Sequence, residues 1–235
     1  MALRVEAARR PGRGHRRRDE PCQDAYATWS DGQRAVVAVA DGLGSQPLSQ
    51  HGSQAAADAA VAFLASQPTW DEAALQDAFA AARAAVERAA NQLGVPLQAL
   101  ATTLQVAVHD ANGTLAAMVG DGATVAGVPA TLVLAPATTG YANEVVPLTA
   151  PTWREHLQVA RHDSPGPVLV FSDGLTRLLL QRQDGRWVPF APFFEAFLPV
   201  VGADGAARRL LDGEDVDRSW DDDKTLAVIA RAPDG

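Results

Sequence analysis

Cysteine is almost absent from this sequence, with Cys22 the single example in 235 residues. One thiol excludes a disulfide within the chain and a zinc site built from cysteines. Long apolar runs are missing too, and no apolar segment follows the N-terminal arginines as a secretory signal would require. We therefore expect a cytoplasmic protein that has no membrane partner.

Basic residues are outnumbered by acidic ones. Lys and Arg total 20 against 28 for Asp and Glu, which gives a formal net charge of −8. Nucleic-acid binding depends on a basic surface, so we expect no nucleic-acid partner. The hydrophobic content of 47% and the charged content of 20% are ordinary for a globular protein. We predict a single domain that spans residues 1–235.

Aspartates stand at the ends of several apolar segments. The segments that lead into an aspartate are residues 35–39 before Asp41, 114–119 before Asp121 and 167–171 before Asp173. Elsewhere the order is reversed, since Asp24 and Asp221–Asp223 each come directly before a strand-like segment. In an antiparallel sheet the start of one strand lies beside the end of its neighbour. We therefore expect these carboxylates to meet at one edge of a β core.

Periodicity elsewhere predicts a mixture of helices and strands. Helical spacing of apolar residues predicts helices over residues 53–66, 71–94 and about 193–211. Alternation predicts strands over residues 102–109 and 114–119. The Arg-rich residues 1–18 read as an edge strand followed by a loop. This pattern indicates an α+β protein in which the helices 53–66 and 71–94 cover one face of a sheet.

Several carboxylates packed together without basic partners repel one another, and a bound divalent cation resolves the repulsion. An aspartate beside a glycine is also ordinary turn chemistry, so any single member could be a turn former. That reading fits poorly for all of them together. A site with oxygen ligands alone suits Mg²⁺ or Mn²⁺ better than Zn²⁺.

The order of these motifs resembles the metal-dependent protein phosphatase family, the type 2C Ser/Thr phosphatases. The matching segments are Gln23-Asp24, Val39–Gly44, Ala101–Leu104, Val119–Asp121, Ser172–Leu175 and Asp222–Thr225. The sequence around Gly14-His15 and Asp41–Ser45 is similar to that of a divergent bacterial branch of this family. The resemblance implies an αββα sandwich of two antiparallel β-sheets flanked by helix pairs, with a two-metal centre at one end.

The resemblance also implies residue roles and a reaction. Asp41 would bridge two Mn²⁺ or Mg²⁺ ions, the Gly42 carbonyl would bind one, and Asp173 and Asp222 would bind the other. Asp24 would hold water on the metal, and Asp121 would serve a third ion. The catalytic set is then Asp24, Asp41 and Asp173. The activity implied is hydrolysis of phosphoserine or phosphothreonine in a phosphoprotein, opposing a Ser/Thr protein kinase.

Three departures from the family pattern concern the metal shell and the substrate. Gln23 replaces an acidic residue, Asp19 replaces the arginine that binds phosphate, and Gly122-Ala123 replaces Ser-Arg. The residues that could take over phosphate binding are His15, Arg16, Arg17 and Arg18, and any of these four could equally be solvated surface.

Two other functions are compatible with parts of this sequence. A phosphatase of the haloacid-dehalogenase type needs a second Asp two residues after the first, but that position is Leu43. The stronger rival is a catalytically weak or inactive module of the same fold that binds phosphoproteins and serves regulation. Gln23 and Asp19 favour the module, whereas the acidic set favours activity.

Overall fold

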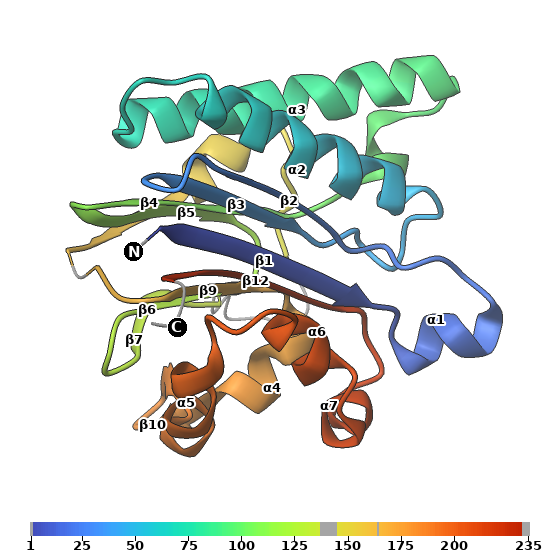
Figure 1. The fold of residues 1–235 in the computed structure, drawn as a ribbon. Helices are drawn as coiled ribbons and strands as arrows, with labels where there is room; N and C mark the ends of the chain where they lie inside the picture. The colour runs from blue at the N-terminus through green and yellow to red at the C-terminus, as the bar shows by residue number, and fades with distance from the viewer. Residues whose placement is uncertain (1, 137–144, 164, 232–235) are drawn as a thin grey trace.

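Two five-stranded antiparallel sheets are stacked face to face between two layers of helices (Figure 1). The structure is a computed structural model that describes residues 2–136, 145–163 and 165–231. Its layer order is helices, sheet, sheet, helices, so the predicted α+β class and αββα sandwich are confirmed.

Sheet 1 has the strand order β2-β3-β4-β5-β8. Its strands are β2 (Ala25–Ser30), β3 (Ala35–Ala40), β4 (Leu104–Asp110), β5 (Gly113–Val119) and β8 (Gln158–His162). The helices α2 (Ser49–Ala65) and α3 (Glu72–Leu93) cover its outer face (Figure 1). They bear apolar residues on the face that packs against the sheet. No helix within the described ranges is long and apolar enough to cross a membrane.

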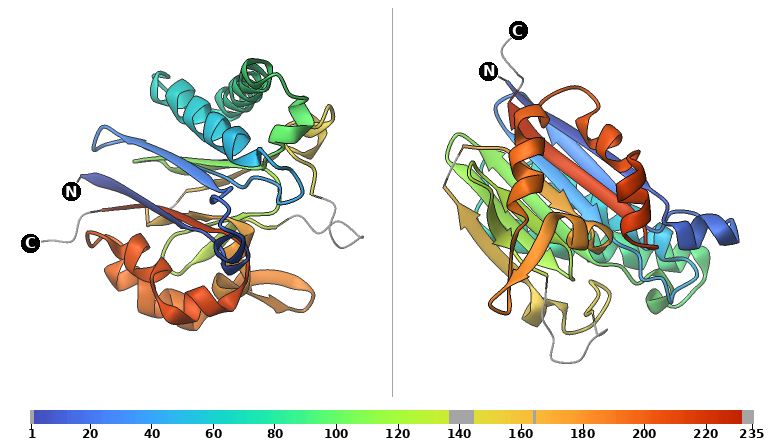
Figure 2. Two further views of the ribbon diagram at one scale, coloured as in Figure 1. Left: turned by 90° about the vertical axis from the view of Figure 1, so that its right-hand side faces the viewer. Right: turned by 90° about the horizontal axis from the view of Figure 1, so that it is seen from below.

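Sheet 2 has the strand order β1-β12-β9-β6-β7. Its strands are β1 (Leu3–Arg10), β12 (Lys224–Arg231), β9 (Val168–Phe171), β6 (Ala123–Ala126) and β7 (Thr131–Leu134). Figure 2 shows from below that helices lie across its outer face. The elements on this side are α4 (Thr176–Leu179), the hairpin β10 (Leu180–Gln183) and β11 (Arg186–Pro189), α5 (Ala191–Phe197), α6 (Ala206–Leu211) and α7 (Glu214–Ser219). Short 3-10 turns lie at Leu97–Leu100, Trp153–His156, Asp173–Leu175 and Leu198–Val200.

Strand β3 is buried along its whole length, as its unbroken apolar sequence predicts. Val36 and Ala38 pack under α2 and α3, whereas Val37 and Val39 pack between the two sheets. Because both faces are covered, no polar alternation is needed. Full burial of each valine contributes about 1.5–3 kcal/mol, which holds the strand end at a fixed place.

The observed bounds of α2 and α3 agree with the helices predicted from the sequence, except that α2 begins earlier. Asp71 caps α3 by accepting a hydrogen bond from the Ala74 N–H at 2.8 Å, and Gly94 ends it in the left-handed conformation. Helix α2 begins at Ser49, four residues before the predicted start at 53. The bare backbone of Gly52 lets the helix pack directly against the Leu100 carbonyl, and this contact outweighs the low helix propensity of glycine.

Three local features differ from what the sequence predicts. The helix expected over about residues 193–211 is divided into α5, a 3-10 turn and α6, and Gly205 before α6 is in the left-handed conformation. Residues 13–18 were expected to form a loop after the edge strand, but they form the short helix α1 (Arg13–Arg18). Contacts with the segment 221–223 hold it there, including a hydrogen bond from the Gly14 N–H to the Asp221 carbonyl at 3.0 Å. The hairpin 180–189 was not foreseen either, because its residues show no clear alternation. The edge position of β1 in sheet 2 is as predicted.

Candidate metal centre

The predicted acidic residues stand where strands of both sheets end. Asp24 comes before β2 and Asp41 after β3, and the pairing of Ala25 with Ala40 places these two ends side by side. In sheet 2, Phe171 pairs with both Ala123 and Leu226. Asp173, Asp121 and Asp222 each lie within four residues of this row, on the side away from the strand interiors. This register places the acids at one end of each sheet, and a hydrogen bond from the Ser172 hydroxyl to Asp24 Oδ2 joins the two ends.

The carboxyl groups influence one another electrostatically. Removal from water raises the pKa of Asp41 well above its usual range, and the charges of Asp24, Asp173, Asp222 and Asp121 add to the effect. Burial is also the first cause for the other members of the group. It raises the pKa of Asp24 to about 8, with the charge of Asp223 second.

The same pattern holds on the side of sheet 2. Burial raises the pKa of Asp173 to about 7, and the charges of Asp121 and Asp222 add to it. Burial and Asp222 raise the pKa of Asp121. Each carboxyl therefore disfavours ionisation of its neighbours, which indicates a site that gains stability from a bound cation.

Backbone contacts fix the turn that carries Asp41. The Thr103 hydroxyl accepts a hydrogen bond from the Asp41 N–H at 3.0 Å, and the Asp41 carbonyl accepts one from the Thr103 N–H at 2.8 Å. Gly42 follows where the chain is tightly enclosed. A Cβ there would lie 2.7 Å from the Gln23 carbonyl oxygen and 2.8 Å from the Ser49 Oγ, so only glycine fits. The turn is therefore rigid beside its carboxylate.

Two buried carboxylate oxygens have no hydrogen-bond partner among the described residues. They are Asp24 Oδ1 and Asp173 Oδ1. The other oxygen of Asp24 accepts a hydrogen bond from the Ser172 hydroxyl at 2.8 Å. A buried acceptor without a partner costs about 1–3 kcal/mol, more if charged, and a hard divalent cation would relieve this cost.

The donor set therefore fits Mg²⁺ or Mn²⁺ chemically, since it offers oxygen atoms alone. The side chains as they stand do not yet form a complete ligand shell. In the described ranges, no group of three or more His, Cys, Asp or Glu side chains is arranged to hold a metal ion. The observations in favour of a metal are the mutual pKa shifts and the two unpartnered oxygens.

Asp222 and Asp223 have opposite surroundings. Asp222 is exposed, and its Oδ1 accepts a hydrogen bond from the Asp223 N–H at 2.9 Å. Asp223 is only 2% exposed and is surrounded by N–H donors. The buried ammonium of Lys224 fastens this segment, since it donates to the Trp220 carbonyl at 2.6 Å and to the Asp222 carbonyl at 2.9 Å. Sequence reasoning left the choice among Asp221–Asp223 to the resemblance and did not find the inward role of Asp223.

The four predicted phosphate-binding residues all belong to α1 and already have acidic partners. His15 is 6% exposed, and its Nδ1 donates to Asp223 at 2.8 Å. The arginine pairs are Arg16 with Asp217 at 2.6 Å, Arg17 with Asp221 at 3.8 Å and Arg18 with Glu20 at 2.7 Å. Binding of phosphate by any of these residues would have to compete with these pairs, and this role stays a prediction.

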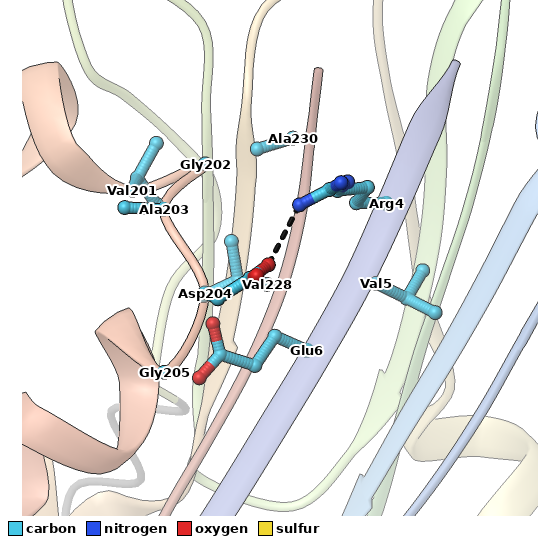
Figure 3. A pocket seen from close by; sticks show the side chains of 10 residues that line it. All are labelled: Arg4, Val5, Glu6, Val201, Gly202, Ala203, Asp204, Gly205, Val228 and Ala230. Atoms are coloured by element: carbon cyan, nitrogen blue, oxygen red, sulfur yellow. Dashed lines mark hydrogen bonds and ion pairs between the residues drawn. The ribbon is translucent and has the colours of Figure 1, made fainter. Parts of the chain in front are cut away.

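Two hollows lined by described residues lie away from the acidic residues. One, of about 160 Å³, lies between β1, β12 and residues 201–205, with the Arg4–Asp204 ion pair at 2.6 Å beside it (Figure 3). Arg4 pairs with Ala230, six positions along β1 from the pair Arg10–Lys224, which is about 20 Å away. A larger apolar hollow of about 620 Å³ is lined by Pro129, Phe194 and Leu198, among other residues. Neither contains a member of the acidic group.

Comparisons with known proteins agree on one family and one fold. Residues 11–212 match the family model for protein phosphatase 2C. A search of curated protein sequences found no significant match. Among solved structures, PppA, described as a key regulatory component of T6SS in Pseudomonas aeruginosa, is similar with a TM-score of 0.68 and 18% identity over 98% of each chain.

Two structures of a bacterial serine/threonine phosphatase are similar as well. PstP/Ppp of Mycobacterium tuberculosis has a TM-score of 0.60 and 18% identity, covering 99% of this chain and 100% of its own. The catalytic domain of PstP in complex with two manganese ions has a TM-score of 0.63 and 19% identity, covering 98% of this chain and 99% of its own. At these identities the similarity shows a shared fold.

Proposed function

Because the chain belongs to the protein phosphatase 2C family, we propose that it hydrolyses phosphoserine and phosphothreonine in proteins with the help of divalent cations. One observation carries this proposal most directly. Buried carboxyl groups from both sheets raise one another's pKa, and Asp24 and Asp173 each keep a buried oxygen that has no partner in the described residues. Such a group of acids is costly unless a cation binds.

Two Mn²⁺ or Mg²⁺ ions would be held by the acidic residues at the strand ends. We assign them to Asp41, the Gly42 carbonyl, Asp173, Asp222 and Asp24, with Asp121 as the ligand of a third ion. When bound, such ions neutralise phosphoryl oxygens and lower the pKa of water. The manganese ions named for the PstP catalytic domain, which shares this fold, support this choice.

The protein's own catalytic residues are Asp24, Asp41 and Asp173. Ser172 holds Asp24 through Oδ2, so that Oδ1 remains free to orient water and to receive a proton from it. Thr103 holds both the N–H and the carbonyl of Asp41 through hydrogen bonds. Fixed carboxylates favour attack by water because little reorganisation is needed during the reaction. No side chain has to act as the nucleophile.

The substrate would be a phosphoprotein, and a Ser/Thr protein kinase would supply it. A phosphate monoester carries the charge that arginines of α1 could bind with paired hydrogen bonds. We assign this contact to the helix bearing Arg16, Arg17 and Arg18, which projects from the body of the fold at the end of β1 (Figure 1). Whether the whole chain, residues 1–235, forms one such domain stays a prediction.

Release of phosphate from a phosphothreonine peptide tests the proposal. We expect turnover with Mn²⁺, loss of turnover in EDTA, and recovery when Mn²⁺ is restored. Asp41→Asn should be inactive under all three conditions. Asp58→Asn is the matched control, since Asp58 is an exposed acid on α2 that accepts a hydrogen bond from Gln54. Equal turnover by the wild type and by Asp41→Asn would overturn the assignment.

A regulatory phosphoprotein-binding module is the second candidate. Gln23 favours it, because a neutral side chain stands where the family has an acid, and its amide donates to the Gln46 carbonyl at 3.1 Å. The structural relative PppA is itself named as a regulatory component. Tight Mn²⁺-dependent binding of the phosphopeptide without turnover would favour the module over the enzyme.

A further inference from the structure

The Asp223 carboxylate is the most completely hydrogen-bonded acid near the metal centre. Its Oδ1 accepts from the Gly12 N–H at 2.7 Å and from His15 Nδ1 at 2.8 Å. Its Oδ2 accepts from the Gln23 N–H at 2.6 Å. Hydrogen bonds to an ionised, buried acceptor are about twice as strong as neutral ones. Asp223 is therefore satisfied by the protein itself and has a different role from that of its neighbour Asp222.

These three bonds join segments that are far apart in the sequence. Gly12 and His15 belong to the start of α1, whereas Gln23 directly precedes Asp24. The Gln23 carbonyl in turn accepts from the Gly42 N–H at 3.2 Å. The Ser53 hydroxyl of α2 donates to the same carbonyl at 2.5 Å. The backbone of Gln23 thus ties Asp223 to the turn after β3 and to α2.

The ends of this network are proposed metal ligands. Asp222 precedes Asp223, Asp24 follows Gln23, and Gly42 donates to Gln23. A displacement of the Asp223 side chain would therefore move ligands from both sheets relative to one another. Residues that orient ligands in this way commonly change metal affinity 10- to 100-fold when they are removed.

Helix α1 completes the network from the other side. Arg13 Nε donates to Asp221 Oδ1 at 2.8 Å, and the Gly14 N–H donates to the Asp221 carbonyl. Gly12 lies so close to the backbone of Asp221 and Asp222 that a Cβ would overlap with it. The helix is therefore seated directly on the segment that carries Asp222.

We propose that Asp223 and His15 are positioning residues that hold the ligands of the metal centre in register, a role that rests on the proposed function. His15 is then a support of the metal site and makes no contact with phosphate. Both of its ring nitrogens face protein carboxylates, since Nδ1 donates to Asp223 and Nε2 lies 3.8 Å from Glu20 Oε2. Its burial at 6% exposure agrees with this role.

Two substitutions at His15 separate positioning from phosphate contact. The amide of Asn can replace the Nδ1–H donor, whereas Leu fills similar space without a donor. We expect His15→Leu to weaken Mn²⁺ binding, measured by calorimetry, at least tenfold, and His15→Asn to stay within about threefold of the wild type. At saturating Mn²⁺, inhibition by inorganic phosphate should be unchanged in both variants. Unchanged Mn²⁺ affinity with weakened phosphate inhibition in His15→Leu would overturn the proposal.

Asp223→Asn provides an independent variant if His15→Leu does not fold. Its amide nitrogen would meet an N–H donor, so we expect Mn²⁺ affinity to fall at least tenfold while the thermal melt remains cooperative. His156→Leu is the matched control, because His156 is exposed in a 3-10 turn, and its Mn²⁺ affinity should equal that of the wild type. If the wild type binds no Mn²⁺, the proposed function itself fails. If the wild type binds and Asp223→Asn binds equally well, only the positioning role fails.

Discussion

Aspartates at the strand ends and aspartates on the flank beside α1 have opposite environments. At the strand ends, burial and neighbouring carboxyls raise the pKa of Asp24 to about 8 and that of Asp173 to about 7. On the flank, slight burial acts upward on Asp217, but hydrogen bonding and charge from Arg16, with the charge of Arg10, lower its pKa overall. On the flank, arginines pair with the aspartate carboxylates. At the strand ends, the carboxyl groups lie near one another and repel.

This contrast separates structural acids from acids kept for a ligand. Exposed ion pairs such as Arg18–Glu20 contribute about 0–1 kcal/mol and involve no unsatisfied group. Buried carboxyl groups without a bound cation reduce the stability of the fold. Groups with such strongly shifted pKa values are found mainly at catalytic and ligand-binding sites. The comparison therefore predicts opposite effects of the same Asp→Asn change in the two regions.

Asp173→Asn should give the largest effect and should change activity and stability in opposite directions. We expect Mn²⁺-dependent phosphate release to fall at least a hundredfold, equivalent to about 2.7 kcal/mol or more, because a proposed metal ligand is lost. In EDTA the melting temperature should rise, since one repelling carboxyl has been removed. Turnover assays and thermal melts with and without Mn²⁺ measure both. A lower melting temperature in EDTA would contradict the account of repulsion at the strand ends.

Much of the fold was accessible from the sequence because the pattern of burial is simple. The unbroken apolar run of β3 and the capped helix α3 carry local signals strong enough to predict their type. The hairpin β10–β11 and the helix α1 have no such signal, since α1 depends on contacts with residues 221–223. Local periodicity does not report contacts made across 200 residues.

The site was predictable to a similar degree. Repetition of Asp beside Gly at strand ends marked Asp41, Asp121 and Asp173, and the pairing of β6 with β9 explains why Asp121 and Asp173 lie at the same end of sheet 2. The sequence did not predict that the side chain of Asp223 points inward. Side chains alternate in extended backbone, so neighbours such as Asp222 and Asp223 face opposite ways. The donors to Asp223, Gly12, His15 and Gln23, come from the far end of the chain. Only the tertiary structure brings them together.

The pH dependence of the ion-free protein sharpens the comparison further. The pKa of Asp24 is about 8 in the folded protein against 3.8 for an ordinary aspartate. Between these values the folded state keeps a proton that the unfolded state has lost, so this group's contribution to stability is complete at low pH and declines as the pH rises towards 8. Between these pKa values, the free energy of unfolding should fall by about 1.4 kcal/mol per pH unit from this group.

Urea unfolding in EDTA at pH 5, 6, 7 and 8 measures this slope. Groups remote from Asp24 contribute equally to the wild type and to Asp24→Asn, so the difference between the two proteins reports Asp24 together with its effect on the pKa of Asp41. We expect the wild type to lose stability relative to Asp24→Asn as the pH rises. Parallel curves for the two proteins would show that Asp24 does not titrate as proposed.

Asp217→Asn should give the smallest effect and serves as the flank's counterpart to Asp173→Asn. Asp217 accepts from Arg16 at 2.6 Å and lies 3.3 Å from Arg10, and its side chain is 23% exposed. Because its pKa is lowered by these arginines, its charge stabilises the fold, and losing it should cost about 1 kcal/mol or less. The melting temperature should therefore fall slightly, in contrast to the rise expected for Asp173→Asn, and Mn²⁺ affinity should stay within about twofold.

The difference in stability between Asp217→Asn and the wild type should shrink in 1 M NaCl, because salt screens a partly exposed ion pair and leaves buried repulsion largely intact. If Asp217→Asn instead stabilised the protein, the flank would be as strained as the strand ends, and the distinction between paired acids and acids kept for a ligand would fail.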